Sequence, residues 1–167
     1  MKLLKSTMEV RRAELADKDI VLDLLDEFRC DCIEQITGEE GQSHTARENG
    51  ASVYESLISR SDYCIFLLEN SDKEAVGIIT GYLCPMLRSG GVRLELEEFF
   101  VQKASRGNDN AKKLMDAISD WARSHKASKI NLESDNQLER AHSFYKKYGF
   151  ESKAQRFVKE LPSTTDA

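Results

Sequence analysis

The segment from Val92 to Ser134 constrains the fold of this chain more than any other. It opens with the β-rich run VRLELEEFFV and closes with SKINLES, and a helix is predicted between them from about Asn110 to His125. One face of that helix carries the apolar side chains Ala111, Leu114, Met115, Ile118, Trp121 and Ala122. Because a strand, a helix and a second strand form a parallel pair joined by a crossover, this segment predicts a βαβ unit.

Earlier β-rich runs predict an antiparallel meander that leads into this unit. DYCIFLLEN and EAVGIITGYLCPML are separated by a polar turn at Asn70–Lys73, and RSGG at Arg88–Gly91 precedes Val92. Turns this short join antiparallel neighbours. A further run, MEVRRAEL at Met8–Leu15, predicts a first strand.

Two amphipathic helices are predicted between the first strand and the meander. Asp17 is the expected N-cap of the first, in which apolar residues recur at helical spacing at Ile20, Val21, Leu24, Leu25 and Phe28. A polar stretch from Thr37 to Gly50 follows, and its length favours a functional role. The second helix is expected through Val53, Leu57 and Ile58.

The C-terminal part predicts one more helix and a last strand. QLERAHSFYKKYGF carries its apolar face at Leu138, Ala141, Phe144, Tyr145 and Tyr148, and Gly149 is its expected C-cap. ESKAQRFVKEL is expected to be the last strand, and the tail from Pro162 to Ala167 to be frayed. We therefore expect one mixed α/β domain over residues 1–167, with its core at about 8–161.

The composition excludes several function classes. A net charge of −5 and the lack of a basic run argue against nucleic-acid binding, which requires clustered Lys and Arg. No apolar run approaches the roughly 20 residues that span a bilayer, so no membrane association is expected. The N-terminus lacks the apolar segment of a secretory signal, so a cytoplasmic location is expected. The spacing of Cys30, Cys32, Cys64 and Cys84 is not typical of a metal site, and we expect reduced thiols and no metal.

The order of these elements and three local sequences resemble the GNAT superfamily of acetyl-coenzyme A dependent N-acetyltransferases. VRRAELADKDIVLDLL resembles the first strand and helix of that family, LEEFFVQKASRGNDNAKKLMD its coenzyme A motif, and AHSFYKKYGF its closing motif. The resemblance covers about Met8 to Leu161. It implies a central mixed sheet with an antiparallel N-terminal meander, a βαβαβ C-terminal half, helices on both faces, and acetyl-CoA as the acetyl donor.

The coenzyme A motif of the family is Arg or Gln, two residues, Gly, one residue, then Gly or Ala. Arg106 and Ala111 match its ends, Gly107 matches the frequent Arg-Gly start, and Asp109 stands where the middle glycine is expected. The motif works by pointing successive backbone N–H groups at a pyrophosphate, aided by the positive end of the helix dipole. The alternative is an ordinary strand-to-helix loop with an Asn/Asp cap.

The residues between Gly107 and Ala111 suit this turn despite the missing glycine. Asn and Asp tolerate the left-handed backbone region best among non-glycine residues, so Asn108, Asp109 and Asn110 are expected to hold the turn. The Asp109 carboxylate is expected to repel the pyrophosphate and to weaken binding. Nearby cations expected to offset this repulsion are Arg106, Lys112 and Lys113.

Candidate catalytic residues lie in EEFFV and FYKKYGF. The first is similar to the Glu-Asp-Phe-Phe-Val of diamine acetyltransferases, whose first Glu is the proposed base, and this implies Glu97. Glu98 competes with it, because a β-bulge would change the phase of the strand. Tyr145 matches the family tyrosine that protonates the departing thiolate. The alternatives are a solvated strand charge for either glutamate and a core aromatic for Tyr145.

The same resemblance implies further cofactor contacts. Backbone groups of Phe99 and Val101, with Phe100 between them, are expected to hold the pantetheine arm, and a nearby N–H to polarise the thioester carbonyl. Asn136 is a candidate contact to the arm, although the usual family asparagine aligns at Leu138. His142 is expected to be structural or near the cofactor.

The leading hypothesis is transfer of an acetyl group to a primary amine of a small molecule in a ternary complex. An acidic surface on the first helices and their loop suits a cationic acceptor, and its candidates are Glu34, Glu39, Glu40, Glu48 and Glu55. The alternatives are a protein Lys or N-terminal acetyltransferase and a catalytically weak acyl-CoA-binding sensor. The resemblance also allows for a homodimer.

Overall fold

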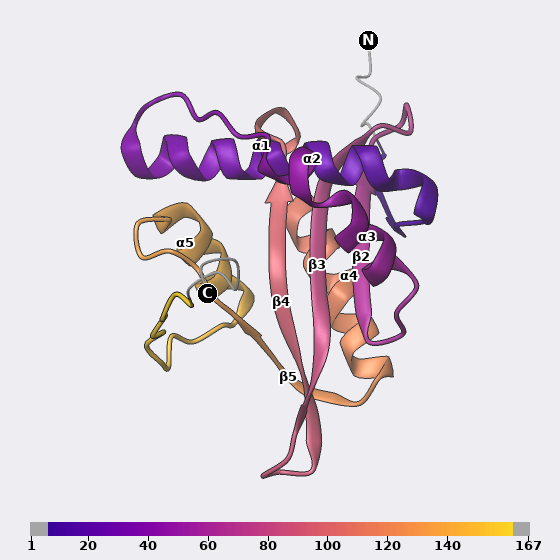
Figure 1. Cartoon of the computed structure of the whole chain (residues 1–167), viewed down its shortest axis with the longest axis vertical. Coiled ribbons are helices and arrows are strands. Elements are labelled where there is room, and N and C mark those ends of the chain that lie inside the picture. Colours follow the sequence, from indigo (N-terminus) through magenta and orange to yellow (C-terminus); the bar gives the residue numbers. More distant parts are fainter. Residues whose placement is uncertain (1–6, 162–167) are drawn as a thin grey trace, which may run out of the picture.

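The structure, a computed structural model, describes residues 7–161, so the expected frayed tail lies outside the described residues. One five-stranded sheet runs in the order β1-β2-β3-β4-β5, and Figure 1 shows β2, β3 and β4 side by side. The strands are β1 Glu9–Arg12, β2 Tyr63–Glu69, β3 Ala75–Met86, β4 Gly91–Val101 and β5 Ala127–Leu132. The first four pair antiparallel and β5 pairs parallel to β4, which confirms the meander, the βαβ unit and the mixed α/β class.

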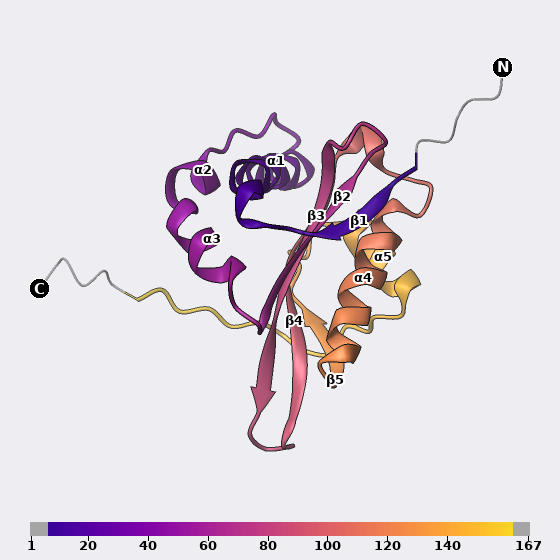
Figure 2. The same cartoon turned by 90° about the vertical axis from the view of Figure 1, so that its right-hand side faces the viewer.

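Helices cover both faces of the sheet (Figure 2). One face carries α1 Lys18–Thr37, α2 Thr45–Asn49 and α3 Ala51–Ile58, and the other carries α4 Asn110–Ser124 and α5 Glu139–Tyr148. Two short 3-10 helices, Leu15–Asp17 and Lys103–Ser105, precede α1 and the loop before α4. The predicted C-cap Gly149 adopts the left-handed conformation that ends a helix, and Gly38 does the same at the end of α1.

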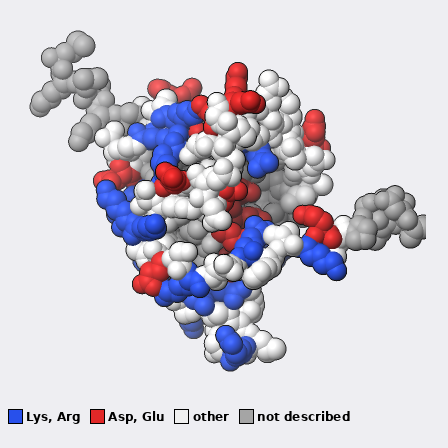
Figure 3. Space-filling view, turned by 90° about the vertical axis from the view of Figure 1, so that its left-hand side faces the viewer, with Lys and Arg blue, Asp and Glu red and all other residues white. Residues whose placement is uncertain are grey.

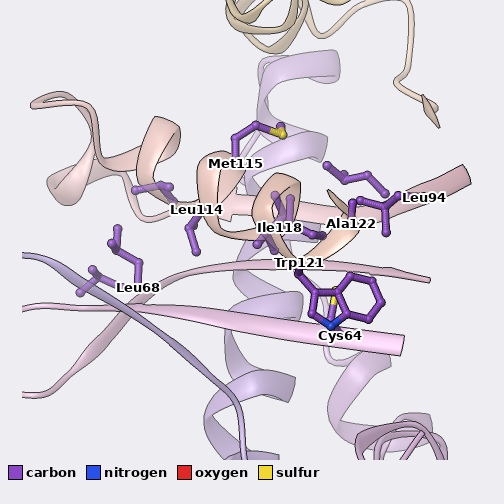
Figure 4. Close-up of a cluster of buried hydrophobic side chains, with 12 residues drawn as sticks. Cys64, Leu68, Leu94, Leu114, Met115, Ile118, Trp121 and Ala122 are labelled. Carbon is purple, nitrogen blue, oxygen red and sulfur yellow. The ribbon is translucent and has the colours of Figure 1, made fainter. Parts of the chain in front are cut away.

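Two apolar clusters, one on each face of the sheet, form the core. Leu114, Met115 and Ile118 of α4 are fully buried against the sheet, and Figure 4 shows them in one cluster with Trp121 and with Leu94 of β4. The second cluster joins α1 and α3 to the opposite face. The predicted apolar face of α4 is therefore the core face.

The helix α2 was not predicted, because its N-terminus is capped from another helix. One carboxylate oxygen of Asp26, on α1, accepts the backbone N–H of Ala46 at 3.0 Å and the other accepts that of Arg47 at 3.0 Å. The hydroxyl of Ser43 also donates to Asp26, at 3.2 Å. Within the predicted polar loop no neighbouring residue signals a helix, since the cap comes from 20 residues away.

The predicted last strand is wrong. Residues 151–161 form no strand, every one of them is exposed, and Phe157 keeps 89% of its surface accessible. The C-terminal half is therefore βαβα within the part of the chain that is described. The apolar side chains Phe157, Val158 and Leu161 of residues 151–161 all stay exposed, so no apolar burial compensates the entropy of ordering a strand here.

Within residues 7–161, no helix is both long enough and apolar enough to cross a membrane.

Candidate active site

The carboxyl-terminal half of β4 has an open edge. β5 pairs with β4 only between Val92 and Leu96, while β4 continues to Val101, and Figure 1 shows the two strands diverging. The Gln102 N–H donates to the Val76 carbonyl of the meander at 2.9 Å. Antiparallel alternation then directs the backbone groups of Phe100 to β3 and those of Phe99 and Val101 to the open edge.

A β-bulge lies at Glu97 and Glu98. Gly81 pairs with Leu96 and Ile79 with Phe99, so the single residue Thr80 faces both glutamates. The Glu98 N–H donates to the Thr80 hydroxyl at 3.1 Å. The bulge changes the phase of the strand, because Leu94 and Leu96 join the α4 cluster whereas Phe100 joins the α1 cluster.

As a result, both glutamates line one cavity of about 290 Å³ on the α1–α3 face. Glu97 is exposed and accepts a hydrogen bond from the Tyr63 hydroxyl. Glu98 is half-buried, and burial, with the neighbouring charge of Glu97, raises the pKa of its carboxyl to about 7. Burial and the hydrogen bond to Glu97 also raise the pKa of Tyr63, so this phenol stays a donor.

Tyr145 faces the open edge from α5. Its ring centroid lies 6.3 Å from that of Phe99 on β4, and Phe144 packs on the same ring at 5.3 Å. Burial, and then the nearby Cys32, raise the pKa of Tyr145 to about 12, so the phenol is protonated at neutral pH. The Tyr145 hydroxyl has no hydrogen-bond partner within residues 7–161 and is free to donate to another group.

The loop before α4 adopts the expected left-handed turn. Gly107 has a φ of 94°, Asn108 of 49° and Asp109 of 61°, so Asn and Asp do hold the backbone shape that glycine usually supplies. The space beside Gly107 is open, since a Cβ there would meet no atom within 4 Å.

This turn leaves backbone donors without acceptors at the N-terminus of α4. Among the described residues no hydrogen-bond acceptor is present for the N–H groups of Gly107, Asn108, Asp109, Ala111 and Lys112. Converging free N–H groups at a helix N-terminus bind phosphate groups. The loop therefore suits an anionic phosphate group.

Comparison with known proteins decides the family. The model of the acetyltransferase (GNAT) family matches residues 22–150, which include the bulge, the turn and Tyr145. The chain belongs to the acetyltransferase (GNAT) family. The expected fold and the expected acyltransferase class are thereby confirmed, and GNAT acetyltransferases generally take acetyl-CoA as the donor.

Solved structures support the GNAT fold, and no curated protein sequence matches the chain. An aminoglycoside acetyltransferase from an uncultured soil metagenomic sample has 17% identity and a TM-score of 0.74, over 93% of this chain and 99% of its own. A ribosomal-protein-alanine N-acetyltransferase from Brucella melitensis biovar Abortus 2308 has 17% identity and a TM-score of 0.69, over 93% and 100%. A transcriptional regulator from Bacillus halodurans C-125 has 18% identity and a TM-score of 0.76, over 93% and 100%.

The cations near the turn at Gly107–Asn110 form their hydrogen bonds with groups other than Asp109. The Arg106 guanidinium donates to the Val101 carbonyl at 2.9 Å and to Asp31 at 2.8 Å. Lys112 binds Asp116 at 2.6 Å, and Lys113 binds the Met8 carbonyl at 3.0 Å. Asp109 itself is exposed and forms no side-chain cap, so its charge faces the solvent beside the free N–H groups.

The sequence analysis missed Asp31, a buried carboxylate of α1 that links the loop before α4 to α1 and α5. Only 6% of Asp31 is exposed, and its Oδ2 accepts hydrogen bonds from Arg106 at 2.8 Å, Arg140 of α5 at 3.0 Å and Gln35 at 2.7 Å. Its Oδ1 is buried without a hydrogen bond in the described chain. The available signal was its position one turn after Phe28, on the apolar face of the predicted helix.

The remaining predicted residues differ in their placement. Asn110 is buried and donates to the Ser105 carbonyl at 2.8 Å, so its side chain braces the loop. Asn136 is exposed in the turn between β5 and α5 and makes no side-chain contact with the other site residues. His142 is half-buried on α5. None of the glutamates of the expected acidic surface lines the cavity of Glu97 and Glu98.

Charge on the outside of this region is mixed. Figure 3 looks onto the side that carries α5 and the C-terminal end of α1, and Lys and Arg lie among Asp and Glu there. No cluster of three or more His, Cys, Asp or Glu within residues 7–161 has the arrangement of a metal site. All four cysteines are free thiols, as expected.

Proposed function

We propose that this GNAT protein transfers an acetyl group from acetyl-CoA to the primary amine of a small molecule, directly and within a ternary complex. The observation that carries the proposal is the junction at the bulge of β4. There Glu97 and Glu98, which line the cavity, directly precede Phe99, whose ring centroid lies 6.3 Å from that of Tyr145. An amine in the cavity and an acyl donor along the edge then lie within reach of each other.

The binding of acetyl-CoA is proposed to use backbone groups at two places. Acetyl-CoA supplies the thioester that the amine attacks. The free N–H groups from Gly107 to Lys112 hold the pyrophosphate, and the outward-facing backbone of Phe99 and Val101 holds the pantetheine arm. Arg106 already occupies the Val101 carbonyl, which leaves the N–H of that residue as the available group.

The base of the reaction is proposed to be Glu98. An amine with a pKa near 10 is protonated at neutral pH and must lose a proton before it attacks. A carboxylate with a pKa of about 7 is a stronger base than an ordinary glutamate and is still ionised to a useful extent at neutral pH. Glu97, held by Tyr63, adds negative charge that favours a cationic acceptor in the cavity.

Tyr145 is proposed to donate a proton to the departing thiolate. Replacement Tyr145→Phe is expected to lower kcat by about 10²-fold, because the thiolate then leaves without a general acid. The matched control is Tyr148→Phe on the same helix, whose hydroxyl donates to Asp116 at 2.7 Å and does not face β4. Steady-state rates of thiol release measure both variants, and equal losses of kcat would refute the assignment.

The test of the function combines binding and turnover. Acetyl-CoA at millimolar concentration is expected to raise the Tm, because a ligand that binds only the folded state stabilises it. A panel of primary amines, with thiol release as the readout, is then expected to show turnover above the hydrolysis of acetyl-CoA alone. Absence of a Tm shift contradicts cofactor binding, and a Tm shift without turnover for any amine contradicts the enzyme.

Asp109 provides a separate prediction for the cofactor loop. Asp109→Asn removes a charge beside the pyrophosphate and keeps a residue that tolerates a φ of 61°, so the Kd of acetyl-CoA is expected to fall by about tenfold. Asp109→Gly is expected to act in the same direction. Isothermal titration at low salt, where the charge is least screened, measures the change.

Asp120→Asn is the control for Asp109→Asn. Asp120 is an exposed residue of the same helix, paired with Arg123 at 2.5 Å and distant in sequence from the turn. Its replacement is expected to leave the Kd unchanged. A Kd that stays constant in both Asp109 variants would show that the carboxylate costs no affinity.

A further inference from the structure

We infer that the acceptor carries its primary amine on a short apolar chain or ring, rather than on a polyhydroxylated or polycationic skeleton. This inference rests on the proposed function and names the substrate class of the same site. It comes from the walls of the cavity that Glu97 and Glu98 line.

The walls of the cavity are mainly apolar. Apart from Gly50, Ala46 and two tyrosine rings, its apolar lining consists of Val21, Leu22, Leu25, Val53, Leu57 and Ile65. Val21 and Leu22 are almost completely buried, so they form an inner wall, whereas Val53 is 52% exposed at the rim. A ligand that fills this space exchanges water contact for contact with aliphatic side chains.

Charge is confined to one part of the lining. Glu97 and Glu98 are the only charged residues that line the cavity in the described chain. One ammonium group is therefore matched by carboxylates at the bulge. A second ammonium group, directed toward Val21 and Leu22, would meet no carboxylate and would lose its hydration without compensation.

Apart from Glu98, the polar side chains of the lining each have a hydrogen-bond partner in the described chain, and that of Thr45 is the Ser43 hydroxyl at 3.5 Å. The Tyr54 hydroxyl donates to the Glu14 carbonyl, the Tyr63 hydroxyl to Glu97, and Thr80 accepts the Glu98 N–H. The Asn49 amide donates to the Thr45 carbonyl at 3.1 Å. Hydroxyl groups of a sugar-like acceptor therefore find few free partners, and an unpaired polar group in such a site is costly.

The size of the cavity limits the acceptor as well. A volume of about 290 Å³ lies just below the range of about 300–1,000 Å³ that is usual for small-molecule sites. The apolar part of the acceptor is accordingly a single ring or a short chain.

The experiment compares primary amines with different skeletons. We expect kcat/KM for phenylethylamine and hexylamine to exceed that for diaminobutane and glucosamine by about 100-fold, from the burial of the apolar group. If diaminobutane or glucosamine equals or exceeds the apolar amines, the inference is overturned while the proposed function stands. If no amine is acetylated, the proposed function fails and the inference fails with it.

A rim variant tests the inference inside the same cavity. Val53→Asp adds a third carboxylate to the cavity, on its apolar wall, and is expected to lower the kcat/KM ratio of phenylethylamine to diaminobutane by about tenfold. Leu87→Asp is the control, because Leu87 is fully exposed in the turn between β3 and β4. An unchanged ratio in Val53→Asp, or an equal change in Leu87→Asp, overturns the inference.

Discussion

Replacement Glu98→Gln is expected to lower kcat/KM for amine acetylation by about 10²- to 10⁴-fold, the usual contribution of a general base. The amide has nearly the shape of the carboxylate but accepts no proton. In the wild type, kcat/KM is expected to rise with pH through about 7, since the base acts in its ionised form and its pKa is about 7. This rise should be absent in Glu98→Gln, and pH profiles with phenylethylamine measure it.

Glu97→Gln is the matched control for that experiment. Glu97 adjoins Glu98 and lines the same cavity, but it is exposed and bound by Tyr63. We expect it mainly to raise KM for the amine and to lower the pH at which the rate rises, because the neighbouring charge that raises the Glu98 pKa is gone. A larger loss of kcat in Glu97→Gln than in Glu98→Gln would transfer the role of base to Glu97.

Glu98 is also expected to make the stability of the protein depend on pH. The pKa of Glu98 is about 7 in the folded protein, above the ordinary glutamate value of 4.5, so the folded state binds this proton more tightly than the unfolded state. Its contribution to stability is fully present below pH 4.5 and is lost as pH rises through about 7. Above neutral pH, Glu98→Gln is therefore expected to have a higher Tm than the wild type, while it loses activity.

Replacement Asp31→Ala is expected to lower the free energy of unfolding by roughly 3 kcal/mol, the usual consequence of breaking a buried ion pair on one side. It leaves Arg106 and Arg140 without the carboxylate that joins them. Because Arg106 also braces the Val101 carbonyl beside the pyrophosphate turn, KM for acetyl-CoA is expected to rise more than KM for the amine. Urea unfolding and steady-state kinetics give the two readouts.

Two other variants separate the effect of Asp31 on the cofactor loop from its effect on the stability of the fold. Asp31→Asn keeps an oxygen acceptor. It is therefore expected to weaken acetyl-CoA binding less than Asp31→Ala does, and to lower the free energy of unfolding by a smaller amount. Asp62→Asn removes an exposed carboxylate, paired with Arg60 at 2.7 Å, and should leave the unfolding free energy nearly unchanged. Equal rises of both KM values in Asp31→Ala would argue against a role in holding the cofactor loop.

Much of the fold is encoded in local patterns. The periodicity of apolar residues predicts α1, α3, α4 and α5, and the short turns predict the β2–β3–β4 meander. Asn108 and Asp109 were correctly expected in left-handed conformation, because their residue type alone favours it. The last strand expected at 151–161 is not formed, since this segment pairs with no strand and buries none of its side chains.

The candidate site, like the fold, is encoded only in part by local sequence. The sequence by itself determined the chemistry that is present: the adjacent carboxylates Glu97 and Glu98, the phenol of Tyr145, and a turn that leaves backbone N–H groups free at a helix N-terminus. Only the tertiary structure decided how these groups are used. Thr80 opposite two residues of β4 creates the bulge that places both glutamates in one apolar cavity, and burial there raises the pKa of Glu98.

Asp31 shows most clearly why the sequence alone could not predict which groups meet in the site. Its partners Arg106 and Arg140 are 75 and 109 residues away, and Asp26 caps α2 from 20 residues away. Local propensity depends on neighbours in sequence, whereas burial, desolvation and charge pairing depend on neighbours in space. The sequence therefore determined which groups this GNAT protein has, and the packing of α1 and α5 around the end of β4 decided which of them meet.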